Sequence, residues 1–255
     1  NPAGFPGQWH LDKQSSGAAV DGNIRGAWER GRTGEGVTIG ILEDGVDRFH
    51  PDLTANYSPA DSWNFVDDVP DVTLPMTDNH RHAAAVAGVA AARGGNGLGV
   101  TGAAPHASIA SLQHSAGLFS NTGNYQDLAD AIRFHSVGES LTIDIKNYSR
   151  GGGGFYQNLA YPILFASEDA LVEAASAGLI FVKSAGNYRS TTFPTAGDAN
   201  KYYLSHLPEE IIVGALNSQG YFAPYSAFGA ALTVTAPGGE TQGMTITTSD
   251  LAGDE

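Results

Sequence analysis

The 255-residue sequence contains no cysteine, which excludes disulfide bonds and thiolate chemistry. It is also poor in basic residues: 13 Lys and Arg stand against 27 Asp and Glu, and the formal net charge is −14. This balance argues against nucleic acid or an anionic membrane as a partner. No apolar run reaches the ~20 residues that a membrane-spanning helix needs, and Asn1-Pro2 does not begin a signal peptide. We therefore expect a soluble, processed chain.

Hydrophobic residues make up 42% of the chain, enough for one large core, and 33 glycines predict many tight turns. Short apolar runs typical of buried strands alternate with helical patterns. The expected strands are 37–42, 63–65, 107–112, 141–148, 179–183, 211–216 and 232–236, and the expected helices are 24–30, 82–92, 125–136 and 167–177. This alternation predicts an α/β fold, with a mainly parallel β-sheet and helices on both of its faces.

Two acids, Glu43 and Asp44, stand directly after the apolar run 37–42 and are followed by a glycine. In an open α/β sheet, groups at the carboxyl ends of strands line the crevice in which ligands bind. The sequence therefore predicts a site at this end of the strand. On this stretch alone, an acidic surface turn is the alternative interpretation.

Two further candidates also stand at the ends of expected elements. His82 opens the small-residue helix 82–92, and Asn187 follows the strand 179–183. A carboxylate, an imidazole and an amide donor are three of the four parts of a nucleophilic hydrolase, and the nucleophile is the fourth. A metal site built from His80, His82 and an acid is the weaker alternative, because histidines two residues apart on a helix do not share a face.

Six ordered segments of the chain are more specific than any single residue. They are NPAGFPGQWHL, TGEGVTIGILEDGVDRFHPDL, DNHRHAAAVAG, NGLGVTGAAPHASI, KSAGN and VTAPGG. In this order and at this spacing they resemble the catalytic domain of a subtilisin-like serine protease of the kexin/furin branch. The resemblance covers nearly the whole chain. It implies a subtilisin-like fold, serine endopeptidase activity on polypeptides, and residues 1–255 as the N-terminal portion of a single catalytic domain.

The resemblance also assigns catalytic roles. His82 matches the general base, Asn187 matches the oxyanion-hole amide, and Glu43 falls at the acid that orients the base. Asp44 then takes the neighbouring position, which faces the substrate's P2 side chain. In the alternative, a one-residue strand slip makes Asp44 the orienting acid, but this would reverse the alternation of faces along the strand.

Other matches concern substrate and metal. Ser149, Arg150 and Gly151 match the strand edge that pairs with the substrate backbone, which is binding by β-augmentation. The family's calcium ion would be held by oxygen atoms, which suit this hard cation. The matching positions are the side chains of Asn1, Asp52 and Asn96 and the carbonyls of Arg93, Leu98 and Val100.

Several positions depart from the family pattern. Ala83-Ala84 replace the usual Gly-Thr, and Gly153 and Gly154 replace an acidic pair that contributes to recognition of arginine at P1. Asp198 is a candidate replacement acid, and Asp130 falls where the branch often carries a glutamate for a basic P4 residue. A solvated helix acid explains Asp130 equally well, so the sequence does not predict dibasic specificity.

The nucleophile is the largest departure, because no Gly-Thr-Ser segment occurs in the 255 residues. We expect a second polypeptide, or a continuation of this one, to carry that segment and to complete the fold. The alternative function is a catalytically impaired pseudoprotease that binds peptides or acts as a chaperone. The resemblance implies a secreted or extracytoplasmic protein. The absence of cysteine does not fix the compartment, but it departs from the eukaryotic members of the branch and suggests a bacterial relative.

Overall fold

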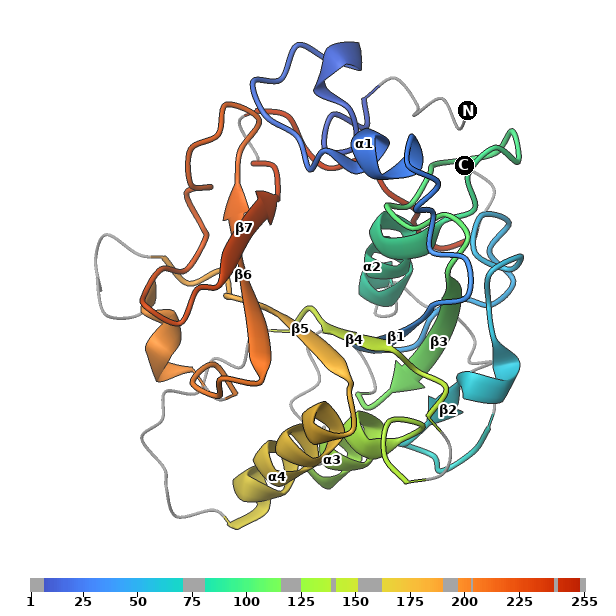
Figure 1. Ribbon diagram of the computed structural model, residues 1–255, viewed down its shortest axis with the longest axis vertical. Helices are drawn as coiled ribbons and strands as arrows, with labels where there is room; N and C mark the ends of the chain where they lie inside the picture. The colour runs from blue at the N-terminus through green and yellow to red at the C-terminus, as the bar shows by residue number, and fades with distance from the viewer. Residues whose placement is uncertain are drawn as a thin grey trace.

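The computed structural model describes residues 7–70, 81–115, 125–138, 141–150, 162–189, 197–202, 204–240 and 243–252. Within these ranges, seven strands pair in parallel to form one sheet with the order β2-β3-β1-β4-β5-β6-β7 (Figure 1). The strands are β1 (Thr38–Glu43), β2 (Trp63–Asn64), β3 (Ser108–Gln113), β4 (Ile145–Tyr148), β5 (Ile180–Ser184), β6 (Glu210–Leu216) and β7 (Val234–Pro237). The predicted parallel α/β sheet is confirmed.

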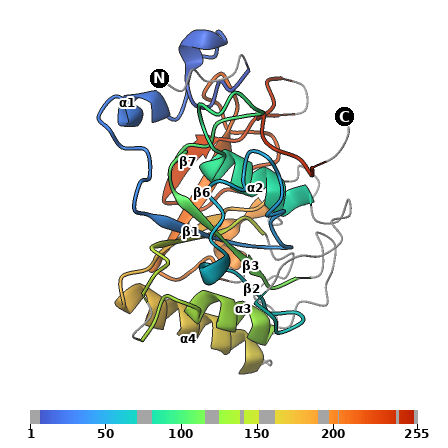
Figure 2. The same cartoon turned by 90° about the vertical axis from the view of Figure 1, so that its right-hand side faces the viewer.

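The α-helices of the described residues are α1 (Ile24–Trp28), α2 (Arg81–Ala91), α3 (Tyr125–Arg133) and α4 (Pro162–Ser176). Short 3₁₀ helices lie at Lys13–Ser15, Pro59–Asp61 and Ala199–Lys201. Helix α2 covers one face of the sheet, and α3 and α4 pack together on the other (Figure 2). Within the described ranges, no helix has both the length and the hydrophobicity of a membrane span.

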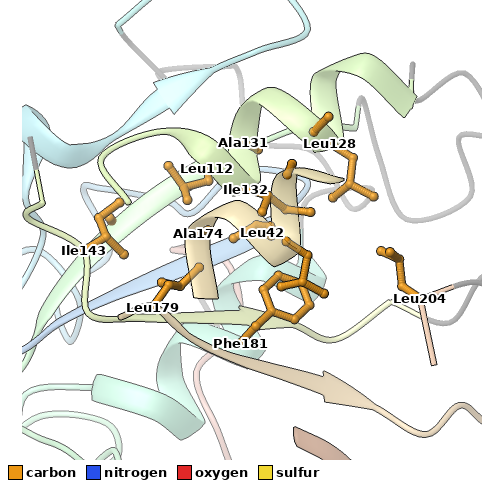
Figure 3. Packing of buried hydrophobic residues seen from close by; sticks show 14 residues of the cluster. Leu42, Leu112, Leu128, Ala131, Ile132, Ile143, Ala174, Leu179, Phe181 and Leu204 are labelled. Atoms are coloured by element: carbon orange, nitrogen blue, oxygen red, sulfur yellow. The ribbon is translucent and has the colours of Figure 1, made fainter. Parts of the chain in front are cut away.

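Strand β1 separates two hydrophobic cores. Ile39 and Ile41 pack towards α2, whereas Leu42 belongs to the cluster formed with α3 and α4 (Figure 3). This alternation is the period of two that a strand imposes on its side chains. A strand buried on both faces fixes the direction of every residue along it, including Glu43 at its end.

Two boundaries differ from the sequence-based prediction. Helix α4 begins at Pro162, so Glu168 and Asp169 lie beyond its first turn and not in it, as the acids had suggested. Proline is common at the first position of a helix, because its fixed φ suits that position and because an N–H there would have no partner within the helix. Strand β4 begins at Ile145, although the apolar pattern started at Leu141.

The sheet order brings the candidate residues to one edge. Strand β1 lies between β3 and β4, and β5 follows β4, so the carboxyl ends of four parallel strands meet there. From β1 the chain first adds strands on one side of the sheet and then on the other. Such a reversal of strand order opens a crevice at the carboxyl ends of the strands.

Candidate active site

The site begins with a contact between the end of β1 and the start of α2. Glu43 is the last residue of β1 and is fully buried, and its Oε2 lies 3.0 Å from Nδ1 of His82. His82 is the second residue of α2, and its side chain is 30% exposed. The structure therefore joins a buried carboxylate to one nitrogen of a histidine that remains accessible to solvent.

Asp44 makes a different contact, although it is the next residue. Its Oδ1 accepts a hydrogen bond from the backbone N–H of Ala83, at 3.0 Å. Asp44 is also fully buried. The structure thus brings Glu43 to the imidazole and Asp44 to the backbone at the start of α2, which is the arrangement predicted without a strand slip.

The segment after β4 closes around the same acids. The backbone N–H of Ser149 donates to Oε1 of Glu43 at 3.1 Å, and Nε of Arg150 donates to Oε2 at 2.9 Å. Nη2 of Arg150 lies 3.3 Å from Oδ2 of Asp44. Sequence reasoning had given Ser149 and Arg150 to the substrate edge and missed these contacts. Gly151, the third residue of that edge, lies outside the described residues.

These contacts set the charge state of the site. Burial alone would raise the pKa of Glu43, but the hydrogen bond and charge of His82, together with the charge of Arg150, outweigh it and lower that pKa. The pKa of His82 is raised, chiefly by its hydrogen bond to Glu43, against the opposing effect of burial. Burial, and then the charge of Glu43, raise the pKa of Asp44.

A second histidine beside the site was not among the predicted residues. His114 follows β3, is buried, and donates its backbone N–H to the carbonyl of Glu43 at 3.2 Å. Burial lowers the pKa of its imidazole to about 4, so this ring is neutral at neutral pH. The sequence did place His114 just after an expected strand, 107–112. In the sheet this strand is the neighbour of β1, which carries Glu43.

Asn187 lies in the turn after β5 and is exposed. The turn is tied to neighbouring segments on both sides of Gly186, since the N–H of Ala185 donates to the carbonyl of Val213 and the N–H of Ala227 donates to that of Gly186, each at 2.9 Å. Gly186 has a φ of +98°, a conformation that favours glycine. Asn187 is therefore exposed on a backbone that is fixed on both sides, just after β5, and β5 ends at the same edge of the sheet as β1.

The two acids proposed for basic substrate residues have structural partners. On α3, Asp130 accepts a hydrogen bond from Nε2 of Gln126 at 2.8 Å. Asp198 accepts the N–H of Asn200 at 3.1 Å, at the start of a 3₁₀ helix, and lies 3.8 Å from Nζ of Lys201. Recognition of basic residues by Asp130 and Asp198 stays a prediction.

The residues expected to hold calcium gather around Asp52. Its side chain is 1% exposed and accepts hydrogen bonds from Nδ2 of Asn96 at 3.0 Å and from the N–H of Val100 at 2.6 Å. Its carbonyl accepts the N–H of Arg93 at 2.8 Å, and Leu98 lies in the same loop. Asn1 lies outside the described residues.

In the structure the groups that contact the Asp52 carboxylate are N–H donors, Nδ2 of Asn96 and the backbone N–H of Val100, so calcium binding here stays a prediction from the residue types. Among the residues that the structure describes, no Lys, Arg or His forms an ion pair with Asp52. A buried carboxylate is usually paired with a cation or bound to a metal, and carboxylate, amide and carbonyl oxygens suit Ca²⁺. The alternative metal site, built from His80, His82 and an acid, has no support among the described residues, since no three His, Cys, Asp or Glu residues there form a group that could hold a metal. His80 itself lies outside the described residues.

Comparison with known proteins gives the context of this geometry. Furin-like protease 1, isoform 1-CRR, of Drosophila melanogaster is 32% identical over 195 residues, which are 73% of this chain and 16% of that protein. Human furin is 33% identical over 192 residues, 72% of this chain and 22% of that protein. The chain thus spans less than a quarter of the length of these curated relatives.

Solved structures agree with the fold. A protease from Pseudoalteromonas arctica superposes with a TM-score of 0.73 at 26% identity, covering 98% of this chain and 80% of that one. A lanthipeptide protease gives the same TM-score at 21% identity, covering 98% of this chain and 69% of the other. The profile of the family described as "Subtilase family" matches residues 34–255. This chain, with its seven-stranded parallel sheet, therefore belongs to the subtilase family.

Proposed function

We propose that the chain carries the general base, its orienting acid and the oxyanion amide of a serine endopeptidase. The observation that supports this most strongly is the 3.0 Å contact between Glu43 Oε2 and His82 Nδ1 at the carboxyl edge of a subtilase sheet. Because Glu43 accepts the Nδ1–H, it fixes the tautomer in which Nε2 of His82 is free to take a proton. The carboxylate then stabilises the imidazolium that forms.

The other steps follow from the same edge. A serine hydroxyl attacks the scissile carbonyl while His82 takes its proton, and His82 returns that proton to the leaving amine, which departs and leaves an acyl-serine ester. Water, deprotonated by His82, then attacks this ester, and the proton passes to the serine oxygen as the acid product leaves. Asn187 donates to the oxyanion that develops on the carbonyl oxygen. The substrate pairs in extended form with the backbone of residues 149–151. Asp44 is fully buried and accepts the N–H of Ala83, so its predicted contact with the P2 side chain is not part of this proposal.

The serine comes from a segment outside residues 1–255, on a continuation or a second polypeptide. The described serine beside α2 is unsuited to the role, since Ser249 packs against Gly88: a Cβ on that glycine would lie 2.7 Å from Oγ of Ser249. Gly88 stands six residues after His82 on α2, which is about 9 Å along the helix axis. This separation from His82 is the reason that Ser249 does not suit the role of nucleophile.

We propose calcium as the cofactor and an extracytoplasmic location for the enzyme. Asp52, Asn96 and the carbonyls of Arg93, Leu98 and Val100, together with Asn1, would hold the ion. When bound, the ion neutralises the buried charge of Asp52 and stiffens the loop after α2. Addition of a chelator should then lower the melting temperature, whereas an unchanged melting temperature would contradict a calcium ion at Asp52.

The test of catalysis uses the protein as isolated, with any segment that accompanies this chain. Wild-type protein should hydrolyse peptides and react with a fluorophosphonate at a serine within Gly-Thr-Ser. His82→Ala should abolish hydrolysis while the circular dichroism spectrum stays unchanged. Peptide binding without turnover in the wild type, unaffected by His82→Ala, would instead support the pseudoprotease. Retained turnover in His82→Ala would remove the role given to His82.

A further inference from the structure

We propose that Arg150 is a positioning residue that holds the Glu43 carboxylate on His82 and the Asp44 carboxylate away from it. This inference rests on the proposed function, because it concerns how the acid of that site is kept in place. It assigns Arg150 to the acids of the site, in contrast to the substrate-binding role that its sequence position suggested.

The guanidinium group reaches three partners through three different nitrogen atoms. Nε donates to Oε2 of Glu43 at 2.9 Å, Nη1 donates to Oγ of Ser115 at 3.0 Å, and Nη2 lies 3.3 Å from Oδ2 of Asp44. The planar guanidinium has fixed angles between its N–H groups, so three simultaneous contacts define its orientation. Arg150 thereby connects the segment after β4 to the segments after β1 and β3.

Three hydrogen-bonding groups hold the carboxylate of Glu43. Oε2 lies within hydrogen-bond distance of both His82 Nδ1 and Arg150 Nε, and Oε1 accepts the N–H of Ser149 at 3.1 Å. Rotation of the carboxylate away from His82 would break the bonds on the other side. A buried ion that is held from two sides keeps its geometry far better than one held by its catalytic partner alone.

Charge gives Arg150 a second effect. Two adjacent carboxylates that are both fully buried repel one another, and a cation between them offsets that repulsion. The charged and titratable groups around the site are listed by element: Glu43 at the end of β1, Asp44 directly after it, His82 on α2, His114 after β3 and Arg150 after β4. Among these, the carboxylates raise the pKa of His82, chiefly through the hydrogen bond from Glu43, and the charge of Arg150 lowers it.

Arg150→Gln has two opposed effects on the pKa of His82: the lost charge raises this pKa, and a loosened Glu43 lowers it. The substitution should lower kcat about 10- to 100-fold, because a loosened acid misplaces the base, and leave KM within about twofold, as expected when an interaction serves only the transition state. Arg150→Lys keeps the charge without the planar guanidinium, so only the loosening of Glu43 remains. In this variant the pKa of His82, measured by NMR titration of its ring protons, should fall while kcat is reduced.

Arg133→Gln is the matched control, since Arg133 pairs with Glu173 on the outer helices and should change neither quantity. A loss confined to KM in Arg150→Gln, or an unchanged pKa of His82 in Arg150→Lys, would overturn the proposal and favour substrate binding by Arg150. If Arg150→Gln fails to fold, Arg150→Lys decides by the same split between kcat and KM. The titration needs no turnover, so a wild type without peptidase activity would contradict the proposed function and still test Arg150.

Discussion

Glutamate is one methylene longer than aspartate, and this length decides which contacts the acid at the end of β1 makes. The Glu43 carboxylate reaches His82 on one side and the Ser149–Arg150 segment on the other. Asp44 accepts the backbone N–H of Ala83 and lies 3.3 Å from Nη2 of Arg150. The two residues that the sequence presents as a pair of similar acids therefore have different chemical environments.

Asn187 offers a prediction at the same scale. Asn187→Ala should lower kcat for peptide hydrolysis by about 10²–10³, because an oxyanion donor acts mainly in the transition state. Its side chain is exposed after β5, so the substitution should leave the unfolding midpoint unchanged. Gln126→Ala, an exposed amide on α3, is the control and should have wild-type kinetics. Unchanged kcat in Asn187→Ala would exclude its role as oxyanion donor.

At the scale of elements, the loop after α2 depends on glycine for two separate reasons. Gly97 and Gly99 have φ values of +78° and +35°, and both lie in the loop that packs on Asp52. A Cβ at Gly97 would meet nothing within 4 Å, whereas a Cβ at Gly99 would collide with the carboxylate of Asp52. Substitutions at Gly97 and Gly99 therefore separate the cost of backbone strain from the cost of disturbing Asp52.

We expect Gly97→Ala to cost about 1–2 kcal/mol of unfolding free energy, from the left-handed backbone alone. Gly99→Ala should cost about 1–3 kcal/mol more, because the side chain must displace a buried carboxylate. Urea unfolding with and without Ca²⁺ measures both, and the stabilisation by Ca²⁺ should shrink only in Gly99→Ala. Equal losses in the two variants would show that the loop does not depend on the Asp52 contact.

The elements themselves were largely predictable, because hydrophobic periodicity reports burial. All seven expected strands and all four expected helices overlap those observed, including the two-residue strand Trp63–Asn64. The fully buried Lys146 was not predictable: its Nζ donates to the carbonyls of Ala131, Ile132 and Phe134 at 2.6–2.8 Å, where α3 ends. Such contacts join distant segments, as do those of Arg150, and no local pattern encodes them.

For the whole molecule, a buried acid links stability to pH. Glu210, at the start of β6, is 5% exposed, and burial raises its pKa from 4.5 to about 8, although the nearby charge of Lys183 opposes the shift. Between these two values the folded state binds a proton that the unfolded state releases. The contribution of Glu210 to stability therefore falls as pH rises through this window.

Glu210→Gln should remove this dependence. The variant should resemble wild type at pH 5, where Glu210 is protonated in the fold, and be more stable than wild type by at least about 1 kcal/mol at pH 8.5, since one pKa unit is worth about that much. Denaturant unfolding at the two pH values measures the difference. Glu35→Gln, at an exposed position, is the control. An equal effect of Glu210→Gln at both pH values would contradict the buried proton.

The central claim is that Glu43, and not Asp44, orients His82 for catalysis. The most direct test compares kcat/KM for peptide hydrolysis by the isolated protein carrying Glu43→Gln with that of Asp44→Asn. We predict a loss of about 10²–10⁴ for Glu43→Gln, as expected when the acid behind a catalytic histidine becomes an amide, and a clearly smaller loss for Asp44→Asn. A larger loss in Asp44→Asn, or wild-type rates in Glu43→Gln, would contradict the account.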